Sequence, residues 1–278
     1  MELDVKIFNH VKDMRYGQSE TEVIRAYVKL PKNLAGRTKL TREILFYNCV
    51  NTLRVPRVLS MHPLTIEEIQ GRQATADDYQ SIIKALDDFH AANKIAGDPT
   101  ELIRYEIYEK IKDRYEASGL KPWIIPRTVN GVKIRRFSEA LEFFRTVKIP
   151  PASMCMIHGD PHFGNIIVDE QGPVFIDPRG SFGGKALYGV PEYDIAKVHL
   201  SLSGYNDFET LVPDVRVVDG NMSIPIGMHP RALQVGRLTA LFLASIWLAN
   251  APGFRDERAI ISHYYALYMF ELLVKKMS

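Results

Sequence analysis

The chain has 278 residues, of which 46% are hydrophobic and 24% are charged; this composition is typical of a globular protein and excludes a disordered or fibrous chain. Its 35 lysines and arginines against 33 acidic residues leave a formal net charge of +2, which disfavours nucleic acid or an anionic membrane as the main partner. Two cysteines, Cys49 and Cys155, are too few for a disulfide framework or a cysteine metal cluster.

The first residues lack the basic and apolar regions of a signal peptide. The most apolar stretch, 238–249, is about six residues short of a transmembrane span, and it ends at Asn250, Pro252 and Gly253. We therefore expect a core helix here, no membrane insertion and a cytoplasmic protein. The sequence does not indicate an oligomeric state.

The first 71 residues alternate between β-prone runs and one helical pattern. We expect strands at 5–13 and 23–30 around a turn at 17–19, a helix at 39–51, and strands at 57–61 and 64–69. From residue 72 onward the pattern is mostly helical. Thr75 and Asp78 have the spacing of a capping box, and Ser138 could cap a later helix.

Further elements follow in the same part of the chain. We expect a helix from Thr100 to Gly119, hairpins at 130–131 and 219–220, strands at 166–168 and 174–176, and helices at 193–202, 231–249 and 256–275. The fold class is therefore α+β, with a small sheet lobe at 1–71 and a larger helical lobe at 72–278.

The most informative segment runs from Met156 to Asp177. Asp160 and Asn165 share a short loop, and the two following strands would return Asp177 to their side. Two hard oxygen ligands with open positions suit Mg²⁺ bound jointly with phosphates, and a third carboxylate can accept a proton from a hydroxyl. Gly159 and Gly164 permit tight turns. These residues predict metal-assisted phosphoryl transfer, although turn formation alone would also explain them.

The pattern His-Gly-Asp-x-His-x-x-Asn at 158–165, with Ile-Asp at 176–177, resembles the catalytic signature of aminoglycoside phosphotransferases and choline kinases. The resemblance covers about residues 23–205 and is tight only over 156–197. It implies a two-lobed protein-kinase-like fold and a kinase that uses Mg²⁺ and ATP or GTP. Features near Arg179 also resemble the branch associated with capsule and surface-sugar biosynthesis.

Carried over to this sequence, the resemblance makes Asp160 the catalytic base and Asn165 and Asp177 the metal ligands. His158 would support the catalytic loop from within, and Asp194 would brace it from a following helix. The loop spans 156–165.

In the first lobe the resemblance requires a cation on the nucleotide phosphates and a carboxylate that holds it. Lys29 and Glu43 are the candidates, with Lys32 and Lys39 as rival cations; both Lys29 and Glu43 could instead be surface charges. Glu68 and Ile69 lie where the family's linker passes the nucleotide base.

The glycine-rich loop that covers the phosphates in the family has no clear counterpart here. Gly17-Gln18-Ser19 is the only small-residue turn before Lys29. It is either the loop of a compact lobe or a later turn, in which case the covering loop is lost or lies outside the chain. We slightly favour the later turn, and the lobe is compact or truncated in either case.

Three further residues could contact substrate or phosphate: His162, Arg179 and Lys185. His162 could equally pack in the loop, and the two cations could be solvated. The leading expectation is a kinase acting on a hydroxyl of a sugar, amino sugar or amino alcohol. The alternative is a weakly active or inactive kinase-like binding domain.

Overall fold

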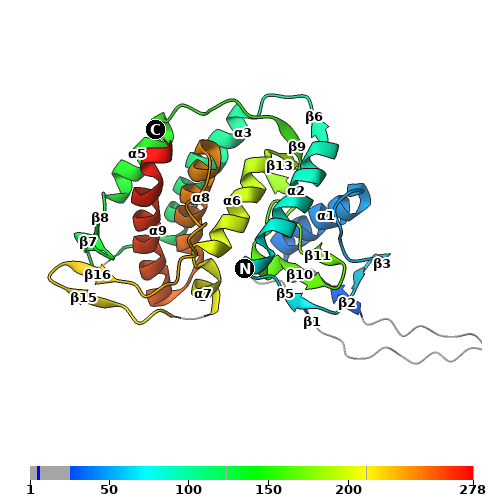
Figure 1. The fold of residues 1–278 in the computed structure, drawn as a ribbon, viewed down its shortest axis with the longest axis horizontal. Helices are drawn as coiled ribbons and strands as arrows, with labels where there is room; N and C mark the ends of the chain where they lie inside the picture. Colours follow the sequence, from blue (N-terminus) through cyan, green and yellow to red (C-terminus); the bar gives the residue numbers. More distant parts are fainter. Residues whose placement is uncertain (1–4, 7–25, 123, 211, 278) are drawn as a thin grey trace, which may run out of the picture.

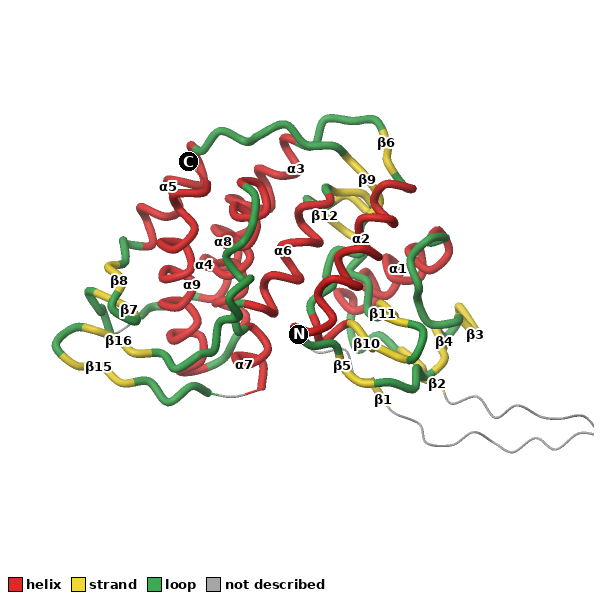
Figure 2. The backbone as a smooth tube through the Cα atoms, in the orientation of Figure 1, coloured by secondary structure: helices red, strands yellow, loops and turns green. Residues whose placement is uncertain are grey.

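The computed structural model of this chain describes residues 5–6, 26–122, 124–210 and 212–277. The predicted turn at Gly17-Gln18-Ser19 lies outside these residues. Figures 1 and 2 show two parts, a smaller one that contains α1 and short strands and a larger one dominated by α8 and α9. The predicted α+β class is confirmed.

The smaller part contains an antiparallel four-stranded sheet in the order β1-β2-β4-β3. Its elements are β1 (Val5–Lys6), β2 (Ala26–Lys29), α1 (Leu34–Cys49), β3 (Val58–Met61) and β4 (Leu64–Glu67). Lys29 at the end of β2 pairs with Leu64 of β4. Leu64 and Ile66 are buried on one face of β4, as strand alternation requires.

Helix α1 begins five residues before its predicted start. The Asn33 side chain accepts a hydrogen bond from the backbone N–H of Gly36 at 2.9 Å and so caps the helix. The first turn is solvent-exposed, and Leu40 is the first buried residue of the helix. The hydrophobic pattern therefore shows only the later, packed part of this helix.

The middle of the chain is mostly helical, as predicted, with short strands between the helices. Its elements are β5 (Arg72–Gln73), a 3-10 turn (Ala76–Asp78), α2 (Tyr79–Ala92), β6 (Lys94–Ile95), α3 (Thr100–Arg104), a π-helical stretch (Tyr105–Glu109), α4 (Lys110–Ser118), β7 (Thr128–Val129), β8 (Val132–Lys133) and α5 (Phe137–Thr146). The Thr75–Asp78 capping box is present. Gly119 ends α4 in the left-handed region with φ of +62°.

The predicted cap at Ser138 is wrong. Helix α5 begins at Phe137, and the preceding residue Arg136 is its N-cap. The carboxylate of Glu139 accepts the backbone N–H of Arg136 at 2.9 Å. This reverse half of a capping box starts the helix without a hydroxyl acceptor at the N-cap.

The last part of the chain completes both parts of the molecule. Its elements are β9 (Met154–Met156), a 3-10 turn (Phe163–Asn165), β10 (Ile166–Asp169), β11 (Gly172–Phe175), β12 (Ser181–Phe182), β13 (Lys185–Ala186), β14 (Tyr188–Gly189), α6 (Pro191–Leu202), α7 (Tyr205–Thr210), β15 (Arg216–Val218), β16 (Asn221–Ser223), α8 (Arg237–Asn250), a 3-10 turn (Ala251–Gly253) and α9 (Asp256–Met277). Both predicted hairpins are present. Antiparallel pairing of β10 with β11 sets Ile166 opposite Phe175.

Two hydrophobic cores hold these elements together. The larger core lies around α8 and includes Trp247, Phe242 and Phe270. The second core joins Phe46 of α1 to residues beyond position 71, such as Phe175. The division into lobes at residue 71 therefore stays a prediction. Helix α8 is the predicted core helix, and within the described residues no helix is long and apolar enough to cross a bilayer.

Burial of His263 in the larger core predicts a pH-dependent stability. His263 lies on α9, where burial lowers its pKa to about 4, and its Nδ1 lies 2.7 Å from the Tyr115 hydroxyl. The unfolded chain would protonate this histidine first, near pH 6.5. The stability that the neutral, buried histidine contributes is therefore fully present above pH 6.5 and is lost as the pH falls toward 4. This loss lowers the free energy of unfolding by about 3 kcal/mol.

Urea unfolding between pH 8 and pH 4 would measure this loss. His263→Gln should flatten the pH dependence of the free energy of unfolding, whereas His62→Gln, at an exposed position, should leave it unchanged. Parallel curves for wild type and His263→Gln would contradict the assignment.

Candidate active site

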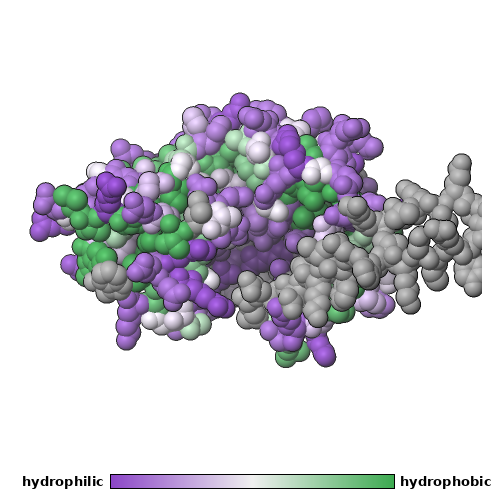
Figure 3. All heavy atoms as spheres, turned by 90° about the horizontal axis from the view of Figure 1, so that it is seen from below, coloured by the Kyte–Doolittle hydropathy of each residue, from purple (hydrophilic) through white to green (hydrophobic). Residues whose placement is uncertain are grey.

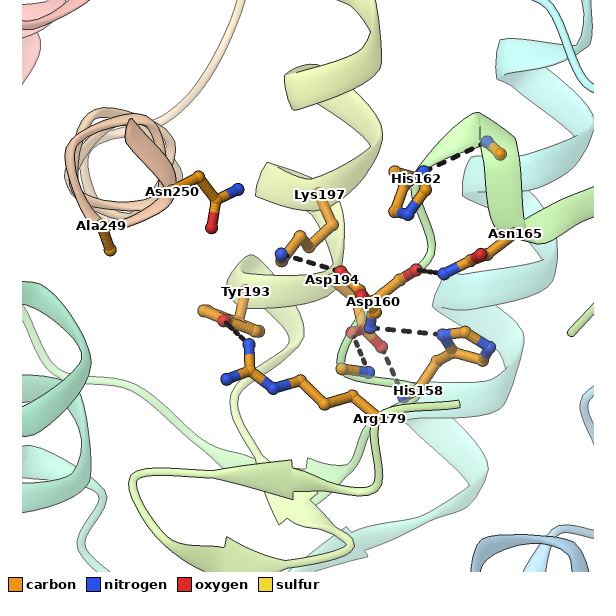
Figure 4. Close-up of polar contacts among 12 residues, drawn as sticks. His158, Asp160, His162, Asn165, Arg179, Tyr193, Asp194, Lys197, Ala249 and Asn250 are labelled. Atoms are coloured by element: carbon orange, nitrogen blue, oxygen red, sulfur yellow. Dashed lines mark hydrogen bonds and ion pairs between the residues drawn. The ribbon is translucent and has the colours of Figure 1, made fainter. Parts of the chain in front are cut away.

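A buried carboxylate on α6 holds the loop that follows β9. Asp194 accepts the backbone N–H groups of His158 at 2.8 Å and Gly159 at 2.7 Å (Figure 4). His90 of α2 lies against the same carboxylate, with Nε2 3.0 Å from Oδ2. Since a carboxylate only accepts hydrogen bonds, His90 donates. Gly159 adopts φ of +83°, which supports the predicted need for glycine in this turn.

His158 connects this loop to the strand that leads to Asp177. It is fully buried, and its Nε2 donates to the carbonyl of Ile176 at 3.0 Å. Its Nδ1 accepts the backbone N–H of Asp160 at 3.3 Å. Burial lowers the pKa of His158, so the ring is neutral and can make both bonds. The predicted supporting residues His158 and Asp194 thus both contact the loop.

The side chain of Asp160 contacts a second residue of α6, Lys197. Its Oδ1 lies 2.8 Å from Nζ of Lys197, an ion pair visible in Figure 4. Burial raises the pKa of Asp160, but the attraction of Lys197, His162 and Arg179 outweighs it and holds the pKa below its usual value. The carboxylate is therefore ionised at neutral pH and can accept a proton.

Asn165 and Asp177 come together through the β10–β11 hairpin. The Asn165 amide nitrogen donates to the backbone carbonyl of Asp160 at 2.9 Å. The backbone N–H of Ile176 donates to the carbonyl of Asn165, also at 2.9 Å, which places Asp177 beside it. Asp177 has φ of +54°, a conformation that aspartate tolerates better than most residues.

Lys29 links the small sheet to this site. Its ammonium forms ion pairs with Glu43 of α1 and with Asp177. Burial lowers the pKa of Lys29, but the two carboxylates outweigh it and raise the pKa overall, so the side chain stays charged. The rival cations Lys32 and Lys39 are exposed. The structure thus brings the predicted pair together and joins it to the predicted metal ligand.

The donor set fits a magnesium ion shared with phosphates. The Asn165 nitrogen is engaged, which leaves its amide oxygen as a ligand, and the Asp177 side chain is 40% exposed. Mg²⁺ typically takes one or two protein oxygens and completes its shell with phosphate and water. In the described residues no group of three acidic, histidine or cysteine side chains could hold a metal alone.

A narrow apolar pocket lies between β2, β4 and the β10–β11 hairpin. Its volume is about 120 Å³, and its lining includes Tyr27, Ile66, Ile69, Ile167 and Ile176, with Lys29 and Asp177 also in the wall. Ile69 therefore lines the pocket as the linker position implied. Glu68 accepts a hydrogen bond from the Tyr27 hydroxyl at 3.2 Å.

A second, polar pocket of about 550 Å³ lies beside Asp160. The face of the molecule seen in Figure 3 is hollowed and hydrophilic near its middle. Arg179 lines this second pocket, and its guanidinium donates to the Tyr193 hydroxyl at 3.1 Å. Arg179 therefore lies where it could contact a substrate bound in this pocket.

The other two predicted contact residues lie elsewhere. Lys185 is exposed on β13 and does not line the polar pocket. His162 stays within the loop, where its Nδ1 accepts the backbone N–H of Gly164 at 3.2 Å and its ring meets Tyr205 edge-on at 5.7 Å. A Cβ at Gly164 would lie 2.8 Å from this ring, which explains the glycine.

Sequence reasoning assigned no role to Lys197, although a signal was present. Lys197 follows Asp194 by three residues on α6, so both side chains project from one face of the helix toward the loop. Arg114 and Asn250 also line the polar pocket. They come from α4 and α8, and nothing in their local sequence marks them.

Known proteins that resemble this chain bear on these observations. The sequence profile of the phosphotransferase enzyme family matches residues 21–220, more than half of the chain. The chain belongs to this family. The predicted resemblance to aminoglycoside phosphotransferases and choline kinases is thereby confirmed. A search of curated protein sequences finds no match.

Solved structures of related fold include a candidate fructosamine-3-kinase from Thermobifida fusca. It is 16% identical, with 91% of this chain and 86% of that chain covered and a TM-score of 0.55. A macrolide 2'-phosphotransferase type I (16% identity, 88% and 83% coverage, TM-score 0.49) and a choline kinase from Cryptosporidium parvum (14%, 91% and 80%, 0.45) are also similar. At 16% identity, the similarity to the first of these structures shows the fold alone. That fold is the predicted protein-kinase-like fold.

The Asp194 brace predicts a large loss of stability for Asp194→Asn. An asparagine has one acceptor oxygen, so its amide nitrogen would face a donor that the carboxylate now satisfies. We expect a loss of about 2–4 kcal/mol in the free energy of unfolding, measured by urea denaturation. Asp87→Asn, at an exposed position on α2, should change stability by less than about 0.5 kcal/mol. Equal stability of the two variants would refute the brace.

Proposed function

We propose that this protein is a Mg²⁺-dependent kinase that transfers the γ-phosphate of ATP or GTP to a hydroxyl of a sugar, amino sugar or amino alcohol in the cytoplasm. One observation carries the proposal: Asp160, Asn165 and Asp177 gather beside the Lys29–Glu43 ion pair. An apolar pocket and a polar pocket adjoin this group.

The apolar pocket would accept the nucleotide base. Isoleucines on both of its walls offer flat apolar contact, and Lys29 at its edge would bind the non-transferred phosphates. Glu43 keeps Lys29 in place and charged. Asn165 and Asp177 would hold Mg²⁺, which when bound neutralises the charge of the phosphates.

Asp160 would act on the acceptor. It would accept a hydrogen bond from the acceptor hydroxyl and align the oxygen with the γ-phosphorus. A bond forms between this oxygen and phosphorus, the bond from phosphorus to the nucleoside diphosphate breaks, and the hydroxyl proton passes to Asp160. The transition state of this reaction is loose and needs little prior deprotonation, so a carboxylate of lowered pKa suffices.

The first test is nucleotide consumption with pools of sugars, amino sugars, aminoglycosides and choline-like alcohols, each with Mg²⁺ and either ATP or GTP. Turnover that depends on the acceptor would support the kinase and identify its acceptor class. The absence of turnover in every pool, together with no binding of Mg²⁺–nucleotide by calorimetry, would favour a kinase-like binding domain instead.

Asp160→Ala tests the catalytic base. Asp160 takes no part in the Asp194 brace through its side chain, so the variant should keep the wild-type fold by circular dichroism, at reduced stability because Lys197 loses its ion-pair partner. We expect kcat to fall by about two to four decades, the usual range for removal of a general base. Glu170→Ala, an exposed acid in the β10–β11 turn, is the matched control and should retain kcat. Near-wild-type turnover by Asp160→Ala would exclude the assigned role.

Asp177→Ala tests the metal ligand. The variant loses the carboxylate proposed for Mg²⁺ but keeps the Lys29–Glu43 ion pair. Calorimetric titration with ATP should therefore show the loss of Mg²⁺-dependent binding, whereas titration without Mg²⁺ should give the same weak binding as wild type. An unchanged affinity in Mg²⁺ would contradict the role of Asp177.

A further inference from the structure

The polar pocket beside Asp160 has a strong excess of positive charge. Five cationic side chains from four parts of the chain line it: Lys39 and Arg42 of α1, Arg114 of α4, Arg179 of the loop before β12, and Lys197 of α6. Asp160 is the only carboxylate among the lining residues that the structure describes. Like charges repel one another, so this cluster of cations does not by itself stabilise the folded chain.

The three arginines of this pocket contact neutral acceptors. Arg114 donates to the carbonyl of Ala249 at 2.8 Å and to Oδ1 of Asn250 at 3.0 Å. Arg42 donates to the Ser181 hydroxyl at 3.2 Å, and Arg179 donates to a tyrosine hydroxyl. None of these guanidinium groups forms an ion pair with a carboxylate of the described residues.

Nearby carboxylates are already engaged. Glu106 pairs with the buried Lys110 and accepts the backbone N–H of Gly183 at 3.0 Å. Burial raises the pKa of Tyr205 in the pocket wall, and the negative charge of Glu209 raises it further. Glu106 attracts Arg179 and Arg114 from behind the wall without forming an ion pair with either. Because this carboxylate already pairs with Lys110, it offsets only part of the excess charge.

The cations also act on one another. Burial lowers the pKa of Arg114, and the positive charge of Arg179 lowers it further. Burial likewise lowers the pKa of Lys197; Asp160 opposes this shift and Arg179 adds to it. Tyr193, Glu106 and Asp160 raise the pKa of Arg179 itself, which therefore stays charged. The repulsion falls on Arg114 and Lys197, and an anion between the cations would relieve it.

The two sides of the pocket face different partners. Helix α1 carries Glu43, which holds Lys29, so Lys39 and Arg42 lie on the side proposed for the nucleotide phosphates. Arg114 and Asn250 come from α4 and α8, on the opposite side. In Figure 4, Asn250 at the end of α8 faces Lys197 and Asp160 across an open space. A molecule there would lie between Asp160 and the far wall.

We infer that the acceptor is itself an anion: a small hydroxyl compound whose phosphate or carboxylate group is bound by Arg114 and Arg179 while its hydroxyl faces Asp160. The inference rests on the proposed kinase function and narrows its acceptor class. The planar guanidinium matches two oxygens of either group, and a pocket of about 550 Å³ is within the usual size for a small ligand. The same charges would repel aminoglycosides and choline-like alcohols.

Calorimetry without nucleotide tests the anion site separately from catalysis. The probes are inorganic phosphate, glycerol 3-phosphate, hexose 1- and 6-phosphates and hexuronates, each organic anion matched with its neutral parent, and with glucosamine and choline as cations. We expect at least one organic anion to bind at least tenfold more tightly than its neutral parent, with an affinity that falls as salt rises. The phosphate and carboxylate arms identify which group is preferred.

Arg114→Gln should weaken this binding by about ten- to a hundredfold, the effect of losing a charge-assisted hydrogen bond. Lys112→Gln removes one charge from the same helix outside the pocket and should bind as wild type. A second variant, Asn250→Asp, controls for a folding defect in Arg114→Gln. It keeps Arg114 and places a carboxylate where the Asn250 side chain now accepts a hydrogen bond from Arg114. This variant should be as stable as wild type but should lose anion binding.

The outcomes separate the two proposals. No preference for any anion over its neutral parent, or binding that Arg114→Gln and Asn250→Asp leave intact, would overturn the anionic acceptor. Faster turnover of a neutral or cationic acceptor than of its anionic counterpart would also overturn it, and the kinase function would then stand. Anion binding without turnover of any pool or binding of Mg²⁺–nucleotide would refute the kinase function and leave the anion site standing.

Discussion

The geometry of the site depends on one buried charge, the carboxylate of Asp194. A buried carboxylate is tolerated only when its oxygens are satisfied, and the partners here are two backbone N–H groups of the catalytic loop and His90 of α2. Three segments that are distant in sequence therefore meet at one point. This arrangement also fixes the backbone at Asp160, because the imidazole of His158 accepts the backbone N–H of Asp160.

His158 carries the constraint from the loop to the metal side of the site. Its ring is neutral and bridges the backbone of Asp160 and the carbonyl of Ile176. Asp177 is the next residue, and its ion pair with Lys29 reaches the small sheet. A continuous path of polar contacts thus runs from α6 through the loop to β2, and it positions both the proposed base and the proposed metal ligand.

The two sides of the site differ in charge although the whole chain is nearly neutral at +2. On the side proposed for the nucleotide, Lys29 lies between two carboxylates. In the wall of the polar pocket, five cations share one carboxylate. The phosphates of a nucleotide would bring negative charge together with a bound metal ion. In the polar pocket, the negative charge that balances the cations would have to come from the acceptor itself. Folding has gathered cations that are spread over about 160 positions of sequence.

The chemistry of the catalytic loop was predictable because it depends on local chain geometry. Asp160, Asn165 and Asp177 lie within one loop and hairpin, and strand pairing brings the ends of a hairpin together whatever surrounds it. Asp194 was likewise identified by the spacing of its motif. The early start of α1 was missed because its first turn is exposed, so only Asn33 marks it. Ser138 was misread because the cap comes from Glu139 instead.

The sequence by itself therefore determined the family, the order of the elements and the residues proposed for phosphoryl transfer, since these are written in short-range patterns. Only the tertiary structure decided that Lys29 meets Asp177, that Lys197 pairs with Asp160, and that Arg114 and Asn250 face the same pocket. These contacts join helices and loops far apart in sequence. Their distances are set by how the helices pack on two cores, which no local spacing encodes.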